Sequence, residues 1–332
     1  MTAETVTSSV TATRPPFDPE LEAVLPMIRA AMPPMRPDAL EESRRLMSEG
    51  LPGMPAPDLT ADGRVSVVDL VVPGPEGQPD LTLLVLRRTD HATAGPAVYH
   101  THGGGMIVGD RRSGVDMFLP FVLEHDAVVV SVEYRLAPEH PHPAPVEDCY
   151  AGLVWTAEHA EELGIDPERI LIAGASAGGG LAAGAALMAR DRGFPALTHQ
   201  VRICPMIDDR LVTQSAQCLD GEGTWDRRDN LFGWTCLLGE ERGGPDVSPY
   251  AAPARATDLA GLPRTYIDTG SVESFRDEAL AYAQRLSQAG VSVDLHMWGG
   301  GFHGFDLMVP QAAISRASVA AREEFIHRAL SQ

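Results

Sequence analysis

One segment near the middle of the chain limits the possible folds more than any other. The apolar run RILIAGA (169–175) predicts a strand buried on both faces, and the run of small residues after Ser176 predicts a helix packed closely on it. The junction, Gly174-Ala175-Ser176-Ala177-Gly178, matches the pattern G-x-S-x-G. Such a sharp turn holds its central residue in strained backbone geometry, so only small neighbours fit. Every other residue from 173 to 180 is Gly or Ala.

Ser176 is therefore a candidate nucleophile. The turn exposes its hydroxyl at the end of a strand, and the N-terminus of the next helix supplies positive potential for a developing oxyanion. Two other interpretations are a glycine-rich turn that only packs a helix on a strand, and a dinucleotide-binding phosphate loop. The segment lacks the G-x-G-x-x-G spacing of that loop, and the strand–turn–helix context favours the nucleophile.

A second glycine-rich loop, His102-Gly103-Gly104-Gly105, follows the apolar run 97–102. In hydrolases with a G-x-S-x-G turn, such a loop supplies a backbone N–H to an oxyanion hole, together with the N–H of the residue after the serine. Glycines let the backbone approach a substrate carbonyl because they carry no Cβ. We therefore predict that Gly103, Gly104 and Ala177 form an oxyanion hole.

The histidines around this loop also allow a metal-site interpretation. His100 and His102 have the spacing H-x-H, as do His140 and His142, and some dinuclear metallohydrolase sites begin with such a pair at a strand end. Those sites need further histidines and a carboxylate close by, whereas glycines follow His102. We therefore expect a reaction that uses no metal ion.

The composition excludes several other classes of protein. The chain has no lysine, which rules out Schiff-base and pyridoxal-phosphate enzymes, Ser–Lys dyads and the Walker P-loop. A net charge of −20 argues against binding nucleic acids or anionic membranes. The N-terminus lacks the apolar core of a signal peptide, and no stretch reaches the roughly 18 apolar residues of a membrane span. Since the four cysteines also form no CxxC pair, we expect a cytoplasmic protein with reduced thiols.

The histidine that would activate Ser176 should follow the later strands, because the order in this kind of hydrolase is Ser, then Asp or Glu, then His. Three histidines qualify. His296 lies within an expected strand and His327 lies on the final helix, whereas His303 lies in the glycine-rich loop GGGFHG just past the last strand. That edge of the sheet is where such folds place their chemistry. We therefore predict His303 as the base, with an exposed loop histidine as the alternative.

The acid of the predicted triad should lie in the loop after the next-to-last strand. Glu273 lies in this loop and is the best candidate, and Asp268 on the strand itself is the competitor. Ser274 and Asp277 have a spacing like that of a capping box, so Asp277 is expected to be structural. Glu278 would then lie on the helix. Either Glu273 or Asp268 could orient an imidazole and stabilise its cation.

The remaining apolar runs predict a mostly parallel sheet with helices on both faces. Runs 64–73 and 81–88 are joined by a short Pro/Gly turn, which favours an antiparallel pair. After them, strand-like runs alternate with helical segments, which is typical of an α/β protein of about eight strands. Further strands are expected near 97–102, 127–134, 169–175, 200–207, 265–269 and 291–298, and helices near 118–125, 145–163, 275–288 and 312–330.

The N-terminal segment and one internal segment depart from this rhythm. Residues 1–16 are polar and expected to be disordered, and residues 19–54 are rich in Pro and Met, with a helical stretch at 38–47. Methionine suits adaptable apolar surfaces, so this segment either packs on the core in the ordinary way or forms a lid over a site. Residues 208–262 carry many charges and are expected to be an insertion.

Together with one further segment, these motifs resemble the hormone-sensitive-lipase family of esterases. That segment, Tyr134-Arg135-Leu136-Ala137-Pro138-Glu139-His140-Pro141, lies between the HGGG loop and the Gly-x-Ser-Ala-Gly-Gly turn, and a terminal His-Gly-Phe begins at His303. The resemblance implies the α/β-hydrolase fold, a mostly parallel eight-stranded sheet with an N-terminal helical cap. It places the cap at residues 1–60 and the catalytic domain at 61–332, with the insertion 208–247 contributing to the cap. It also implies cofactor-free cleavage of short- to medium-chain acyl esters, and suggests a homodimer through the edge strand 291–298.

Two positions depart from the family pattern. The family turn usually reads Gly-Asp-Ser-Ala-Gly-Gly, and Ala175 replaces the Asp here. This change removes a polar anchor beside the nucleophile but no catalytic group. The family's acid segment usually reads Asp-Pro-Leu-Arg-Asp-Glu, and residues 273–278 (ESFRDE) align with it. This alignment supports Glu273 as the acid, with a longer carboxylate.

The resulting hypothesis is a serine esterase that acts on a small-molecule ester. Ser176 attacks the ester carbonyl, His303 takes the serine proton, and Glu273 holds the imidazole. The same scaffold also allows acyl transfer to an alcohol or amine, or amide cleavage as in a deacetylase. A non-catalytic ligand-binding relative would lack the histidine, whereas His303 is present here.

Overall fold

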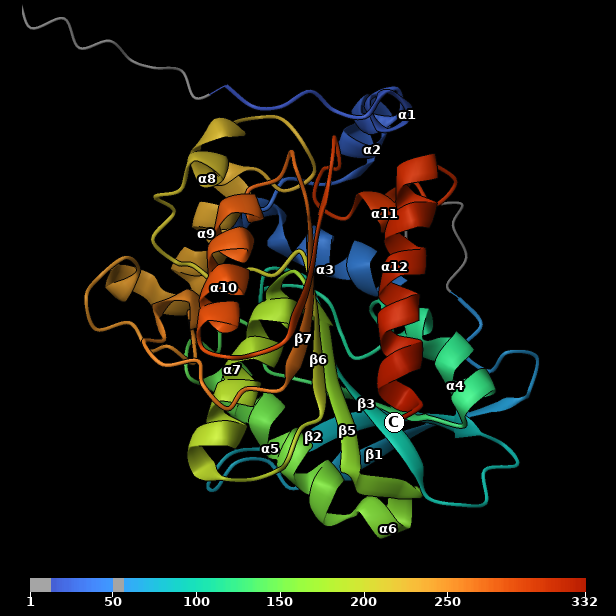
Figure 1. Ribbon diagram of the computed structural model, residues 1–332. Coiled ribbons are helices and arrows are strands. Elements are labelled where there is room, and N and C mark those ends of the chain that lie inside the picture. Colours follow the sequence, from blue (N-terminus) through green and yellow to red (C-terminus); the bar gives the residue numbers. More distant parts are fainter. Residues whose placement is uncertain (1–12, 50–56) are drawn as a thin grey trace, which may run out of the picture.

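The computed structural model describes residues 13–49 and 57–332. An eight-stranded sheet runs through its centre with the spatial order β1-β2-β4-β3-β5-β6-β7-β8 (Figure 1). The pairs β1–β2 and β2–β4 are antiparallel, and the others are parallel. The strands are β1 (Val65–Val72), β2 (Leu81–Arg88), β3 (Gly95–Thr101), β4 (Val128–Glu133), β5 (Ile165–Ala175), β6 (His199–Ile203), β7 (Arg264–Gly270) and β8 (Val293–Trp298). The predicted α/β-hydrolase sheet is confirmed.

Helices cover both faces of the sheet, as expected. On one face lie α5 (Ala144–Glu158), α7 (Ala177–Arg192) and α10 (Arg276–Gln288), and on the other lie α4 (Leu119–His125) and α12 (Ala313–Leu330) (Figure 1). Because side chains alternate along a strand, β3 contributes Tyr99 to the apolar cluster under α5, α7 and α10, and Val98 to the cluster under α4 and α12. The sheet therefore lies between two buried apolar layers, which hold its strands in position.

Several boundaries differ from the expected ones. The strand expected at 200–207 ends at Ile203, because Cys204 takes a positive φ of 38° and turns the chain away from the sheet. The helix expected at 145–163 is divided at His159 into α5 and α6 (Ala160–Leu163). The helix expected near 118–125 begins with a 3-10 turn, η2 (Val115–Phe118).

The segment 208–262, expected to be an insertion, contains helices and turns and no strand. Its elements are α8 (Gln214–Cys218), α9 (Arg227–Leu238), η3 (Gly239–Glu241) and η4 (Pro253–Arg255). Helix α9 begins with a capping box in which the carboxylates of Asp226 and Asp229 accept from each other's backbone N–H. This capping box stabilises the N-terminus of α9.

The described part of the N-terminal region forms short helices, of which the first two pack beyond the ends of β7 and β8. They are α1 (Pro19–Glu22), α2 (Leu25–Ala31), η1 (Pro37–Ala39) and α3 (Leu40–Glu49). Leu21 and Leu25 join an apolar cluster with Val272, which follows β7, and Phe302, which follows β8. Most of the segment expected to be disordered, residues 1–12, lies outside the described residues. Within the described ranges, no helix is both long and apolar enough to cross a membrane.

Candidate active site

Ser176 lies in the sharp turn between β5 and α7. Its backbone has φ 57° and ψ −122°, a conformation that non-glycine residues rarely adopt and that costs about 1–3 kcal/mol. Two backbone hydrogen bonds hold this conformation: the N–H of Ser176 donates to the carbonyl of Ile203 at 2.8 Å, and the N–H of Met206 donates to the carbonyl of Ser176 at 2.9 Å. The neighbouring strand β6 thus imposes the strained turn.

The two glycines of G-x-S-x-G are required by close backbone contacts. A Cβ on Gly174 would lie 2.4 Å from the carbonyl carbon of Gly178, and a Cβ on Gly178 would lie 2.1 Å from the carbonyl oxygen of Thr101. Both distances are far below ordinary van der Waals contact, and backbone atoms cannot rotate away. The small residues around Ser176 are therefore fixed by the approach of β5 and α7 to the end of β3.

His303 lies in the loop between β8 and α11 (Phe305–Met308), and it faces the serine. Its Nε2 is 2.9 Å from Oγ of Ser176. Two contacts position the residue: its ring packs edge-on against Phe275 at 5.1 Å between centroids, and its backbone carbonyl accepts a hydrogen bond from the hydroxyl of Thr224. Of the three histidines considered from the sequence, the structure brings His303 to the serine.

Glu273 is the carboxylate that faces the other side of the imidazole. Its Oε1 lies 3.4 Å from Nδ1 of His303, and its Oε2 accepts from the N–H of Gly270 at 2.9 Å. The residue is only 1% exposed. A buried carboxylate held by a backbone donor can keep an imidazole in one orientation, with Nδ1–H toward Oε1 and Nε2 toward Ser176.

Asp268, the competing acid, makes different contacts. Its Oδ2 accepts from the hydroxyl of Tyr266 at 2.9 Å and from that of Ser318 at 3.5 Å. Burial raises the pKa of Asp268 to about 6, and the nearby Arg322 opposes this shift. Among the hydrogen bonds of the described residues, none joins Asp268 to His303. The structure therefore brings Glu273, and not Asp268, to the histidine.

The expected capping box of Ser274 and Asp277 is wrong. Helix α10 begins at Arg276, and its N-cap residue is Phe275, which makes no side-chain cap. Ser274 instead donates to the carbonyl of Trp225 at 3.0 Å, and Asp277 accepts from the N–H of Ser215 at 2.8 Å. These two side chains fasten α10 to the insertion, because the insertion offers partners that no local pattern could reveal.

Glu278 lies on α10, as expected, and is 2% exposed. It accepts from the backbone N–H groups of Ile207 and Asp208 at 2.8 and 3.2 Å. Burial raises its pKa well above the usual range of a glutamate. Its contacts fix the chain just after β6, where the N–H of the neighbouring Met206 donates to the carbonyl of Ser176, so its role is structural.

The HGGG loop lies against the serine turn. Gly103 and Gly104 line the same cavity as Ser176. Their backbone N–H groups have no hydrogen-bond acceptor in the part of the chain that the structure describes. Ala177 is the first residue of α7, so its N–H belongs to the free N-terminal turn of that helix. These three donors are available to a ligand oxygen placed beside Ser176.

The histidines of the first H-x-H pair, His100 and His102, make structural contacts. Nδ1 of His100 bonds to the hydroxyl of Ser131 at 2.9 Å, and burial lowers the pKa of His100 to about 3. The ring of His102 stacks on that of Tyr134 with 4.0 Å between the ring centroids. The tyrosine hydroxyl donates to the backbone carbonyl of His102 at 2.9 Å. Within residues 13–49 and 57–332, neither pair belongs to a group of three potential metal ligands. His102 and Tyr134 instead support the HGGG loop.

The cavity at Ser176 has a volume of about 200 Å³ and a mostly apolar lining. Several of its lining residues could not be expected from the sequence motifs. Cys204 lies next to the predicted triad, with its sulfur within 4.8 Å of ligand atoms of Glu273 and His303. An almost fully buried ion pair, Asp306–Arg322, forms another part of the lining. Asp306 follows the His-Gly-Phe motif closely enough to have been noticed, whereas Arg322 lies on the final helix without any motif.

Comparison with known proteins places the chain in a family. A family model described as an alpha/beta hydrolase fold matches residues 98–307. Esterase LipI of Mycobacterium tuberculosis is 36% identical over 93% of this chain and 95% of its own length. An arylesterase of Saccharolobus solfataricus is 31% identical over 80% of this chain and 82% of its own length.

Solved structures give the same answer. A bacterial heroin esterase superposes with a TM-score of 0.86 at 41% identity, and the match covers 95% of this chain and 98% of that one. Esterase LipW of Mycobacterium marinum superposes with a TM-score of 0.81 at 33% identity, covering 96% and 98%. The chain therefore belongs to the α/β-hydrolase family, in its hormone-sensitive-lipase-like group of carboxylic ester hydrolases.

Proposed function

We propose that this protein is a serine carboxylesterase that hydrolyses short- to medium-chain acyl esters through Ser176, His303 and Glu273. The observation that carries the proposal is the 2.9 Å separation between Nε2 of His303 and Oγ of Ser176. At this distance the imidazole can take the hydroxyl proton as Oγ attacks an ester carbonyl carbon. The carboxylate of Glu273 then faces the imidazolium and stabilises its charge.

The oxyanion formed by this attack would be held by the N–H groups of Gly103, Gly104 and Ala177. His303 next gives its proton to the alcohol oxygen, the ester C–O bond breaks, and the acyl group stays on Ser176. A water molecule then attacks the acyl carbonyl carbon while His303 takes its proton. The bond between the acyl group and Oγ of Ser176 breaks, His303 gives the proton back to Oγ, and the carboxylic acid leaves. Loss of one oxyanion-hole donor typically costs about 3–4 kcal/mol of transition-state stabilisation.

We also propose that residues 1–60 and the insertion 208–247 together form a cap over the catalytic domain 61–332. Met32 and Met35 come from the N-terminal region, and Thr224 and Trp225 come from the insertion; all four line the cavity with Ser176. A methionine-rich wall adapts its shape to different apolar groups. This origin of the lining supports a cap that selects substrates by the shape of the acyl and alcohol groups.

The size and lining of the cavity support small ester substrates. A volume of about 200 Å³ suits a short or medium acyl chain better than a long one, and the relatives named above are esterases. A cytoplasmic location and a homodimer through the β8 edge stay predictions from the sequence.

The decisive test is hydrolysis of p-nitrophenyl esters from acetate to laurate by the wild type and by Ser176→Ala in parallel. The proposal expects turnover that falls with the longest chains in the wild type and is lost in the variant. Full activity of Ser176→Ala would refute the assigned nucleophile. Labelling of Ser176 by an organophosphate without any ester turnover would instead point to acyl transfer or amide cleavage, which added acyl acceptors and anilide substrates would separate.

A further inference from the structure

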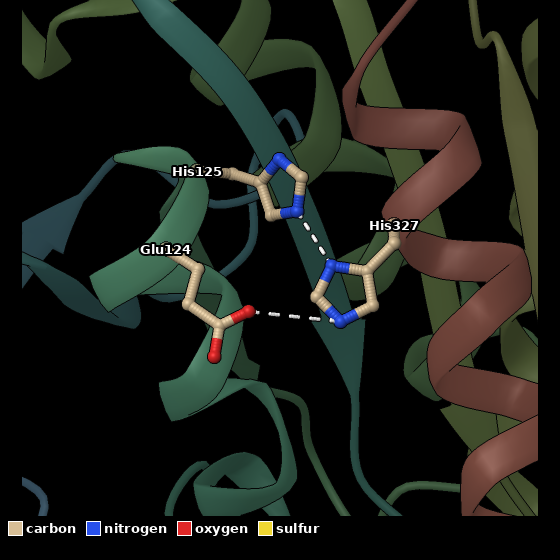
Figure 2. Close-up of side chains that lie close together, drawn as sticks. All are labelled: Glu124, His125 and His327. Atoms are coloured by element: carbon tan, nitrogen blue, oxygen red, sulfur yellow. Dashed lines mark hydrogen bonds and ion pairs between the residues drawn. The ribbon is translucent and has the colours of Figure 1, made fainter.

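Three side chains with metal-binding donors meet on the surface, on the face of the sheet covered by α4 and α12. Glu124 and His125 end helix α4, and His327 lies in the last turn of α12 (Figure 2). Nε2 of His125 is 2.6 Å from Nδ1 of His327, and Oε2 of Glu124 is 3.7 Å from Nε2 of His327. One ligand atom from each residue lies within 4.8 Å of the other two.

We propose that Glu124, His125 and His327 bind one divalent transition-metal ion, of the kind represented by Zn²⁺, which links α4 to α12. Two imidazoles and one carboxylate form a donor set that suits Zn²⁺, Ni²⁺ or Cu²⁺. Mg²⁺ and Ca²⁺ prefer sites made of oxygen atoms, so they should not compete. A water molecule would complete a four-coordinate site.

The two histidines need only a small movement to accept the ion. Zn–N bonds of 2.0–2.1 Å and a tetrahedral angle place two ligand nitrogens about 3.3 Å apart, compared with 2.6 Å here. The His327 side chain is 34% exposed and that of Glu124 is 62% exposed, so both can adjust by side-chain rotation. Without an ion, a single proton lies between His125 and His327, because one ring nitrogen must donate and the other must accept. Metal binding turns both nitrogens into lone-pair donors, with each ring proton on its other nitrogen.

The electrostatic environment favours a cation, with one opposing charge. The C-terminal ends of α4 and α12 give a negative potential, and Glu124 adds a full negative charge. Arg169 opposes the ion, but its guanidinium donates to the carbonyl of Leu330 at 2.6 Å and is held there.

The site lies apart from the proposed chemistry. None of its three residues lines the cavity at Ser176, and they come from two helices on the face of the sheet opposite α7 (Figure 1). The ion would join two helices that also meet through the edge-on packing of Phe121 on His327. It should therefore raise the stability of the folded protein by mass action while leaving ester turnover unchanged.

The test is titration of the chelator-treated full chain with Zn²⁺, followed by calorimetry and thermal unfolding. The wild type should bind one ion at this site and show a higher Tm with Zn²⁺ than without it. His125→Ala and His327→Gln should each weaken binding at least about tenfold, as expected when a ligand or its support is removed, and should abolish the Tm rise. Glu124→Gln should weaken binding less, because both imidazoles remain. His140→Ala, which removes an exposed imidazole elsewhere, should bind as the wild type does.

A second group, Cys204, Glu273 and His303, must be distinguished from this site because it also offers metal ligands. Binding there would inhibit ester hydrolysis and, with Co²⁺ as the probe, produce a thiolate charge-transfer band. Binding at Glu124, His125 and His327 should produce neither. The proposal fails if His125→Ala and His327→Gln bind Zn²⁺ as tightly as the wild type, or if the only bound ion inhibits turnover. Only variants whose Tm without metal equals that of the wild type are compared, so that a loss of Zn²⁺ binding does not reflect misfolding.

Discussion

Arg44 and Glu139, which are 95 residues apart in the chain, form a two-point ion pair. Nη1 of Arg44 donates to Oε1 of Glu139 at 2.8 Å, and Nη2 donates to Oε2 at 2.7 Å. The same guanidinium donates to the carbonyls of Ile107 at 2.9 Å and Ala137 at 3.1 Å. Helix α3 of the proposed cap is thereby fastened both to the end of the HGGG loop and to the segment Tyr134–Pro141.

Removing this connection should loosen the cap. We expect Arg44→Ala to lower the free energy of unfolding by about 1–2 kcal/mol, because two carbonyls and a carboxylate lose their donor while the exposed part of the pair contributes little. It should also raise KM for the larger esters more than for acetate, since α3 carries Met47 of the cavity lining. Urea unfolding and an ester series measure both effects.

Arg45→Ala is the matched control for that prediction. Arg45 pairs with Glu49 within the same helix at 2.9 Å, and its side chain is 57% exposed. Such a pair typically contributes less than about 0.5 kcal/mol. Equal effects of Arg44→Ala and Arg45→Ala on KM would show that the cap is not held through Arg44.

The Arg44–Glu139 pair should also depend on pH. The hydrogen bond from Arg44 lowers the pKa of Glu139 to about 2, from the usual 4.5 of a glutamate. A lowered carboxyl pKa stabilises the fold fully above pH 4.5, and this contribution is lost as the pH falls through about 2. The difference in unfolding free energy between the wild type and Glu139→Gln should therefore be constant above pH 5 and shrink progressively below pH 4.5. A difference that grows on acidification would contradict the pair.

Two carboxylates can be compared to test the acid of the triad. Glu273→Gln should lower kcat by about 10³–10⁴-fold, because the amide can hold His303 in the wrong tautomer and cannot stabilise its cation. Asp268→Asn should lower kcat less than about tenfold, since Asp268 bonds to Tyr266 and Ser318 instead. Steady-state kinetics measures kcat of both variants, and the Tm of each variant checks that it is folded. A larger loss of kcat for Asp268→Asn than for Glu273→Gln would show that Asp268 is the acid of the triad.

The HGGG loop predicts contrasting effects for two glycine substitutions. Gly104 has a φ of +108°, and a Cβ there would lie 2.1 Å from the carbonyl oxygen of Val108. Gly104→Ala should therefore displace an oxyanion-hole donor and lower kcat by at least about 10²-fold. Gly299→Ala is the control, because a Cβ at that position meets nothing within 4 Å. Normal kcat for Gly104→Ala would exclude this loop from oxyanion binding.

The sequence determined the sheet and the candidate chemistry because these depend on local patterns. Apolar runs with short turns specify strands, and the small residues around Ser176 specify a strand-to-helix turn whatever the rest of the chain does. Parallel strands bring their C-terminal ends to one edge, so Ser176 and His303 were expected to meet there. Glu273 was preferred over Asp268 from its place in a loop, and the contacts of both residues agree with that preference.

Other features were decided only by tertiary contacts between segments far apart in sequence. Ser274 and Asp277 do not cap α10. They bond to the insertion instead, because Trp225 and Ser215 lie beside them in the folded chain. The meeting of His125 with His327 spans 202 residues and has no local signature, and the Arg44–Glu139 pair likewise has none. Local sequence patterns determine the backbone geometry of a few neighbouring residues. The partners of a side chain depend instead on how the helices and the sheet pack in the folded protein. The sequence therefore determined the fold and the candidate nucleophile, and the packing decided what covers the cavity and which surface groups meet.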